Sequence, residues 1–177
     1  VTGWIDWKGL SRNRELYEFV KDAISFRKDH PVLHMARELK GVDYLTKGFP
    51  DVSLHGERAW YLSYENTSRL LGLMYYGAYA REENDQKASE DDFIYVGYNF
   101  HWENRRLALP NLPDGMCWKK ITDTSFHGEG FHVKDAEEYK KTIEIGPRAI
   151  VVLLGRQEAK KDAGMAHVAA LQDDHQA

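Results

Sequence analysis

The chain has 177 residues, of which 42% are hydrophobic and 29% charged, enough to build the core of one ordinary domain. Its net charge is −4, and neither the acidic nor the basic residues form a long run. The cluster of basic residues expected of a nucleic-acid-binding protein is therefore missing. No apolar run approaches the roughly 18 residues that span a bilayer, so no membrane partner is expected. The single cysteine, Cys117, allows neither an internal disulfide nor a multi-cysteine metal site. It leaves the location open and favours the cytoplasm slightly.

An amphipathic helix is predicted over residues 12–29. Ser11 is a good N-cap, and Pro31 ends the helix because the residue before a proline is pushed out of helical geometry. Charged residues occupy much of the opposite face. The apolar residues that recur on one helical face are Leu16, Phe19, Val20, Ala23 and Ile24.

After residue 48 the pattern changes to short apolar runs and turn signals. Residues 48–51 and 54–57 are typical of loops, and the charged residues 81–92 indicate an exposed loop. Gly146 and Pro147 separate two apolar runs, which predicts a hairpin. The expected fold is therefore mainly β, an antiparallel β-sandwich preceded by one helix. The predicted strands are 69–76, 93–100, 105–109, 116–122, 142–145 and 149–154.

Catalytic and metal-binding patterns are absent from the sequence. Retaining glycosidases need two carboxylates about 5–5.5 Å apart, but most acidic residues here fall in charged runs, and none is predicted at the end of a buried strand. His30 and His34 are four residues apart, yet Pro31 lies between them and breaks the helix. His127 and His132 flank glycines in a predicted loop, where surface histidines are the simpler interpretation. We therefore expect no catalytic residue, no metal and no cofactor.

Several segments, taken in order, resemble the isoamylase and pullulanase-type enzymes, which are the α-1,6-debranching members of the α-amylase superfamily. The resemblance covers about residues 4–154 and is closest to bacterial pullulanase-like glycogen-debranching enzymes. The segments that carry it are Trp4–Trp7, Phe26–Pro31, Phe49–Trp60, Ile94–Trp102, Leu107–Pro110, Trp118, Asp123–Thr124 and Arg148–Leu153.

The resemblance implies a domain organisation. Residues 1–31 would be the end of a catalytic (β/α)₈ barrel with its last helix, and 32–60 a connecting segment. Residues 61–156 would form the carboxy-terminal β-sandwich, followed by a tail, 157–177, that is disordered or loosely docked. The family's catalytic carboxylates lie upstream of this region, so none can be assigned here. The start, Val1–Trp4, is typical of neither a signal peptide nor an initiator methionine, so we expect a piece of a longer protein.

The leading interpretation is thus a non-catalytic carboxy-terminal fragment of a debranching glycoside hydrolase, inactive alone, whose parent acts on α-glucan (glycogen, starch or pullulan) through the missing barrel. The alternatives are a free-standing carbohydrate-binding β-sandwich module and an unrelated interaction domain. We expect the helix face at Leu16, Phe19, Val20 and Ala23 to lack a full partner, which favours self-association. Four aromatic or imidazole side chains are candidate carbohydrate contacts: Trp4, Trp7, His55 and Trp60.

Overall fold

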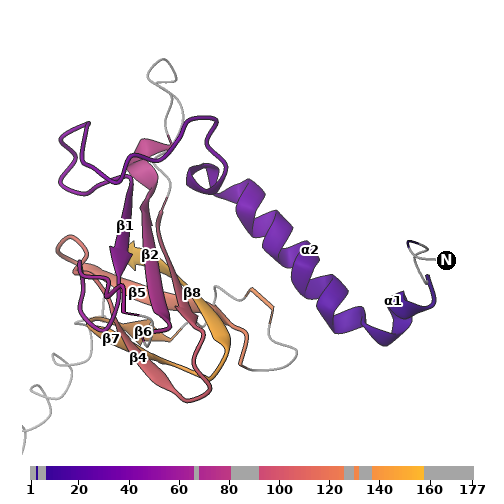
Figure 1. Cartoon of the computed structure of the whole chain (residues 1–177). Helices are drawn as coiled ribbons and strands as arrows, with labels where there is room; N and C mark the ends of the chain where they lie inside the picture. Colours follow the sequence, from indigo (N-terminus) through magenta and orange to yellow (C-terminus); the bar gives the residue numbers. More distant parts are fainter. Residues whose placement is uncertain are drawn as a thin grey trace, which may run out of the picture.

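The computed structural model describes residue 3 and residues 7–65, 68–80, 92–125, 130–131 and 137–157 (Figure 1). Its helical elements are α1 (Gly9–Arg12), α2 (Arg14–Asp29), η1 (Pro31–Leu33) and η2 (Gly77–Tyr79). Within these ranges no helix has the length and apolar character needed to cross a membrane. The strands are β1 (Val52–His55), β2 (Leu70–Tyr76), β3 (Phe93–Asn99), β4 (Arg105–Ala108), β5 (Met116–Asp123), β6 (Glu138–Tyr139), β7 (Thr142–Ile145) and β8 (Ala149–Gln157).

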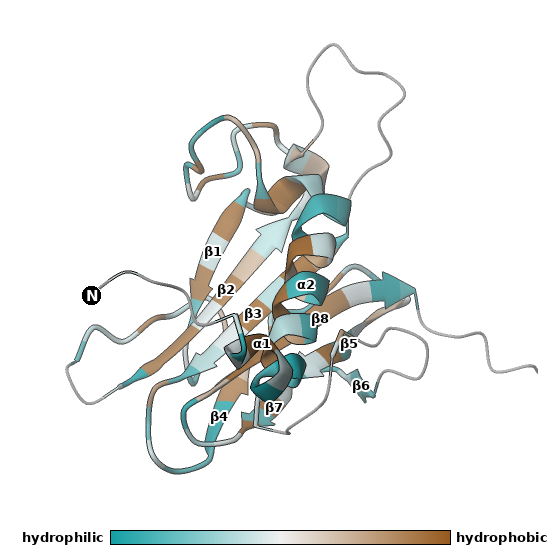
Figure 2. Cartoon of the chain, turned by 90° about the vertical axis from the view of Figure 1, so that its right-hand side faces the viewer, coloured by the Kyte–Doolittle hydropathy of each residue, from teal (hydrophilic) through white to brown (hydrophobic). Residues whose placement is uncertain are grey.

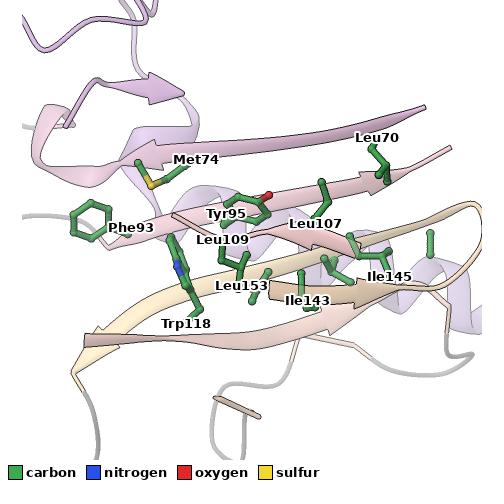
Figure 3. Close-up of a cluster of buried hydrophobic side chains, with 12 residues drawn as sticks. Leu70, Met74, Phe93, Tyr95, Leu107, Leu109, Trp118, Ile143, Ile145 and Leu153 are labelled. Atoms are coloured by element: carbon green, nitrogen blue, oxygen red, sulfur yellow. The ribbon is translucent and has the colours of Figure 1, made fainter. Parts of the chain in front are cut away.

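The strands form two antiparallel sheets. Six of them pair in the order β1-β2-β3-β8-β5-β6, and β4 pairs with β7 in a second, smaller sheet. The expected mainly-β antiparallel fold is confirmed, and the two sheets are compatible with a sandwich. Figure 3 shows the shared core, in which Leu107 and Ile143 of the small sheet meet Tyr95, Trp118 and Leu153 of the large one. All five side chains are almost completely buried, so this cluster joins the sheets.

The opposite face of the large sheet carries a second, smaller core. Ile94, Val152 and Leu154 are buried there together with Val32 of η1, and Phe26 at the end of α2 packs against them. Figure 1 shows that α2 approaches the sheet at this end and lies further from it toward α1. The helix is therefore held to the domain mainly by its last turns.

The predicted helix is confirmed, but its start is wrong. A break at Asn13, with φ −115° and ψ 36°, separates α1 from α2. Ser11 lies inside α1, where its hydroxyl donates to the carbonyl of Lys8 at 3.0 Å, so it does not cap the long helix. The end is as expected, because His30 is extended just before Pro31.

All six predicted strands exist, but the hairpin between the last two is wrong. β7 pairs with β4, whereas β8 lies between β3 and β5. Arg148, at φ +51°, lies in the turn that carries the chain from one sheet to the other, and its N–H donates to the carbonyl of His101. Much of β8 is buried on both faces, so it belongs at the centre of the large sheet, with a partner strand on each side.

β1 was missed, because residues 54–57 were predicted to be a loop. Ser53 and His55 are polar but point inward, and Val52 and Leu54 lie on the other face. The strand alternates as any strand does, with the polar members on the buried side. Residues 81–91 and 158–177, which hold most of the predicted exposed loop and nearly all of the predicted tail, lie outside the described residues.

Candidate functional site

The four residues predicted to contact carbohydrate do not form one group. Trp4 lies outside the described residues. Trp7 is 78% exposed in the turn before α1, at the end of the helix remote from the sheets (Figure 1). His55 and Trp60 contact each other, with ring centroids 5.0 Å apart in an edge-to-face arrangement. The structure therefore reduces the candidate site to the loop that follows β1.

His55 holds this loop from inside the domain. Its Nδ1 accepts a hydrogen bond from the backbone N–H of Trp60 at 2.8 Å. Because Nδ1 accepts, the ring hydrogen of the neutral imidazole is on Nε2, which donates to Oγ of Ser53 at 2.8 Å. Burial lowers the pKa of His55 to about 4, in agreement with a neutral ring.

A direct sugar contact by His55 is excluded by its surroundings. Its side chain is 0% exposed, and both ring nitrogens already have partners. It also cannot exchange protons with a substrate that never reaches it. The prediction that His55 touches carbohydrate is wrong for this structure, and what remains for it is a positioning role.

Trp60 is presented to solvent by an uncommon backbone conformation. Its φ is +63°, in the left-handed region that side chains other than glycine rarely adopt, and its side chain is 49% exposed. The ring rests on Phe49 as well as on His55, with a centroid distance of 6.2 Å to Phe49. Strain of this kind costs about 1–3 kcal/mol and persists only where the surroundings impose it.

Backbone hydrogen bonds close the same loop. The N–H groups of Gly56 and Tyr61 both donate to the carbonyl of Arg58, at 3.2 and 3.4 Å. The carbonyl of Gly56 accepts from the N–H of Ala108 at 3.0 Å, which ties the loop to β4. The loop is thus ordered before any ligand arrives. Sequence reasoning did not single out Ser53 or Tyr61, although the alternation of Ser53 and His55 with Val52 and Leu54 is the pattern of a strand.

A second group of exposed aromatic residues lies at the end of β3. Trp102 is 58% exposed, but its indole is stacked on the ring of His101, with centroids 4.1 Å apart. The guanidinium carbon of Arg69 lies over the same indole, 4.8 Å from its centroid. Trp118, the other tryptophan considered for a binding module, is 1% exposed and donates its Nε1–H to the carbonyl of Pro110. Trp118 is therefore a core residue.

Among the residues that the structure describes, two carboxylates are buried, contrary to the expectation that none would flank a buried strand. Asp51 directly precedes β1 and Asp123 is the last residue of β5. Asp51 accepts backbone N–H groups from Lys40, Gly41 and Val52 at 2.7–2.8 Å, and Asp123 accepts from the backbone and hydroxyl of Ser125. Both shape loops. Across the described ranges, no group of three metal-ligating side chains occurs.

The helix presents a separate apolar surface. Leu16, Val20 and Ile24 recur every four residues and are 62%, 46% and 51% exposed. Phe19 is half-buried instead, with its ring 5.6 Å from that of Phe131. Figure 2, in which α2 lies in front of the large sheet, shows both hydrophobic and hydrophilic bands along this helix. We call Leu16, Val20 and Ile24 the helix stripe.

The chain matches two curated isoamylases, from Pseudomonas amyloderamosa and from Pseudomonas sp. strain SMP1. In each case the identity is 29% over 127 residues, which is 72% of this chain and 15% of the isoamylase. Most of this chain is thus similar in sequence to part of an isoamylase. It spans less than a fifth of the length of the isoamylases it matches, and no protein-family model matches it.

Solved pullulanases share the fold of this chain. Type I pullulanase of Bacillus subtilis, in a complex with maltose, aligns with a TM-score of 0.52 and 18% identity over 84% of this chain and 17% of the pullulanase. The pullulanase of Bacillus acidopullulyticus aligns with a TM-score of 0.50 and 15% identity. This alignment covers 84% of this chain and 15% of the pullulanase. The expected resemblance to the carboxy-terminal portion of a debranching glycoside hydrolase is confirmed.

Proposed function

We propose that this chain is the non-catalytic carboxy-terminal part of an α-1,6-glucan-debranching glycoside hydrolase and stabilises that enzyme's catalytic barrel. The observation that carries the proposal is the helix stripe. Three aliphatic side chains at a four-residue spacing are about half exposed or more on a helix that packs on its own domain mainly through its last turns. A stripe of this kind suits burial against another protein surface. In relatives about five times as long as this chain, the remaining residues can supply such a surface.

The relatives support a substrate class for the whole enzyme. The Bacillus subtilis pullulanase was solved with maltose, an α-glucan fragment. We propose that the parent of this chain acts on glycogen, starch or pullulan through a barrel upstream of residue 31. A free-standing carbohydrate-binding module would use exposed aromatic residues but has no need for an exposed aliphatic helix.

The test is the release of reducing sugar from pullulan, glycogen and amylopectin by the isolated chain. We expect none above a buffer blank, because the two buried carboxylates of the described chain are bound to their own loops. The proposal fails if sugar is released and the activity disappears when one carboxylate of this chain is replaced. A reading frame with no barrel upstream would also overturn it.

A further inference from the structure

The loop after β1 differs in chemistry from the helix stripe. The stripe is aliphatic, whereas the loop exposes two aromatic rings in succession, Trp60 at 49% and Tyr61 at 59%. The exposed residues Glu57 and Arg58 add charged hydrogen-bonding groups to the same loop. Aromatic rings with polar groups beside them suit a ligand that has both apolar ring faces and hydroxyls.

We propose that Trp60, with Tyr61 beside it, forms a binding surface for a linear α-1,4-glucan chain, and that His55 is the residue that positions it. This surface is called the Trp60 platform below. The proposal rests on the proposed function for its ligand class. The indole of Trp60 would stack on a glucose ring, and the charged groups of Glu57 and Arg58 would bond to its hydroxyls.

The backbone of Trp60 is the strongest argument for this surface. A large aromatic residue at φ +63° costs conformational energy that a glycine would avoid. The fold nevertheless holds it there through the 2.8 Å bond to the buried Nδ1 of His55. A residue that only filled the core would turn inward, but half of this side chain remains in solvent. The geometry is that of a preorganised contact, which loses little entropy on binding.

The experiment is a titration of the whole chain with maltoheptaose, followed by ¹⁹F NMR of 5-fluorotryptophan. The chain has five tryptophans, so each resonance can be assigned by one tryptophan-to-phenylalanine variant. We expect the Trp60 resonance to shift with a Kd in the millimolar range, and Trp60→Ala to weaken binding about fivefold or more, the size of one stacking contact. Trp102→Ala is the matched control, because Trp102 is similarly exposed, and it should leave binding unchanged.

His55 is tested by two variants. His55→Leu removes the acceptor for Trp60, so the sugar-free Trp60 resonance should move and binding should weaken. His55→Asn places an amide oxygen near the position of Nδ1 and should restore both. A role confined to stability would lower the melting temperature of both variants without weakening the sugar affinity of the folded protein.

Three outcomes would overturn the Trp60 platform. They are no binding up to about 20 mM maltoheptaose, binding that survives Trp60→Ala, and binding that shifts Trp102 instead. Equal affinity for a β-1,4-linked oligomer of the same length would remove the α-glucan assignment. None of these results touches the test of the proposed function, which depends on the hydrolysis assay and on the upstream barrel.

Discussion

The phenol of Tyr95 occupies the space that a side chain on Gly72 would need. A Cβ on Gly72 would lie 2.0 Å from Oη of Tyr95 and 2.6 Å from Cζ. Tyr95 extends across β2 in this way, and its hydroxyl donates to the carbonyl of Ala108 at 3.1 Å. Because Gly72 has no side chain, Tyr95 of the large sheet can hydrogen-bond to β4 of the small sheet. This bond lies beside the loop that contains Trp60.

Replacement of Gly72 by alanine should therefore destabilise the domain. The clash is with a buried ring that cannot move aside without losing its bond to Ala108. We expect the free energy of unfolding, measured in urea, to fall by about 1–3 kcal/mol or more. Gly9→Ala in α1 is the control, because the nearest atom to its Cβ is 3.8 Å away and alanine favours helix. Equal stability of the two variants would contradict the packing described here.

Acid should weaken the fold through His55. The pKa of His55 is about 4 in the folded chain, against an ordinary value near 6.5. Between these values the unfolded chain binds a proton that the folded chain does not, so stability falls as the pH drops from about 6.5 to 4. The total loss is about 3 kcal/mol. Urea unfolding at a series of pH values measures it, and His55→Asn should flatten the slope over this range. A slope unchanged in that variant would assign the acid sensitivity to other groups.

The fold was largely predictable because apolar periodicity dominates its core. The runs at β2, β3 and β8 are so rich in apolar residues that strands were the natural prediction. Pairing was not predictable from Gly146 and Pro147, since a turn signal shows where the chain reverses and not which strands become neighbours. Strand β1 was not predicted, because Ser53 and His55 are polar residues that face inward.

The candidate site was predictable only in part. Trp60 was singled out as an aromatic residue in a loop, and it is exposed. Nothing local in the sequence distinguishes a histidine that touches a ligand from one buried beneath it. His55 is buried because Trp60, Ser53 and Tyr95 surround it, and those contacts depend on the sheet as a whole.

The helix stripe should drive self-association of the isolated chain. Leu16 is 62% exposed and makes little contact with its own domain, so Leu16→Asp should leave folding stability nearly unchanged. A charge on an apolar contact surface should weaken dimerisation about tenfold or more. Sedimentation over a range of concentrations measures this. Lys21→Asp, on the polar side of α2, is the control for added charge.

Phe19→Asp, next to the helix stripe, gives a less direct test of self-association. Its ring contacts Phe131, so the substitution also removes packing within the chain. We expect it to lower the melting temperature as well as the dimer affinity. A strictly monomeric wild-type chain at high concentration would contradict the prediction of self-association.

The last prediction concerns Asp51, which organises the loop between η1 and β1. Its carboxylate accepts three backbone N–H groups, and the side chain is 0% exposed. Asp51→Asn keeps the shape but turns an amide NH₂ toward at least one of these donors. The expected loss is about 1–3 kcal/mol of unfolding free energy, because a charge-assisted bond is lost and a part-buried N–H is left without its acceptor. Hydrogen exchange should speed up first at the amides of Lys40 and Gly41. Asp114→Asn, at a solvent-exposed carboxylate outside this loop, serves as the control for the loss of one charge. The loop leads to Phe49, on which Trp60 rests, so the Asp51 variant should also broaden the Trp60 resonance. Unchanged exchange at Lys40 and Gly41 would show that the loop is held by other contacts.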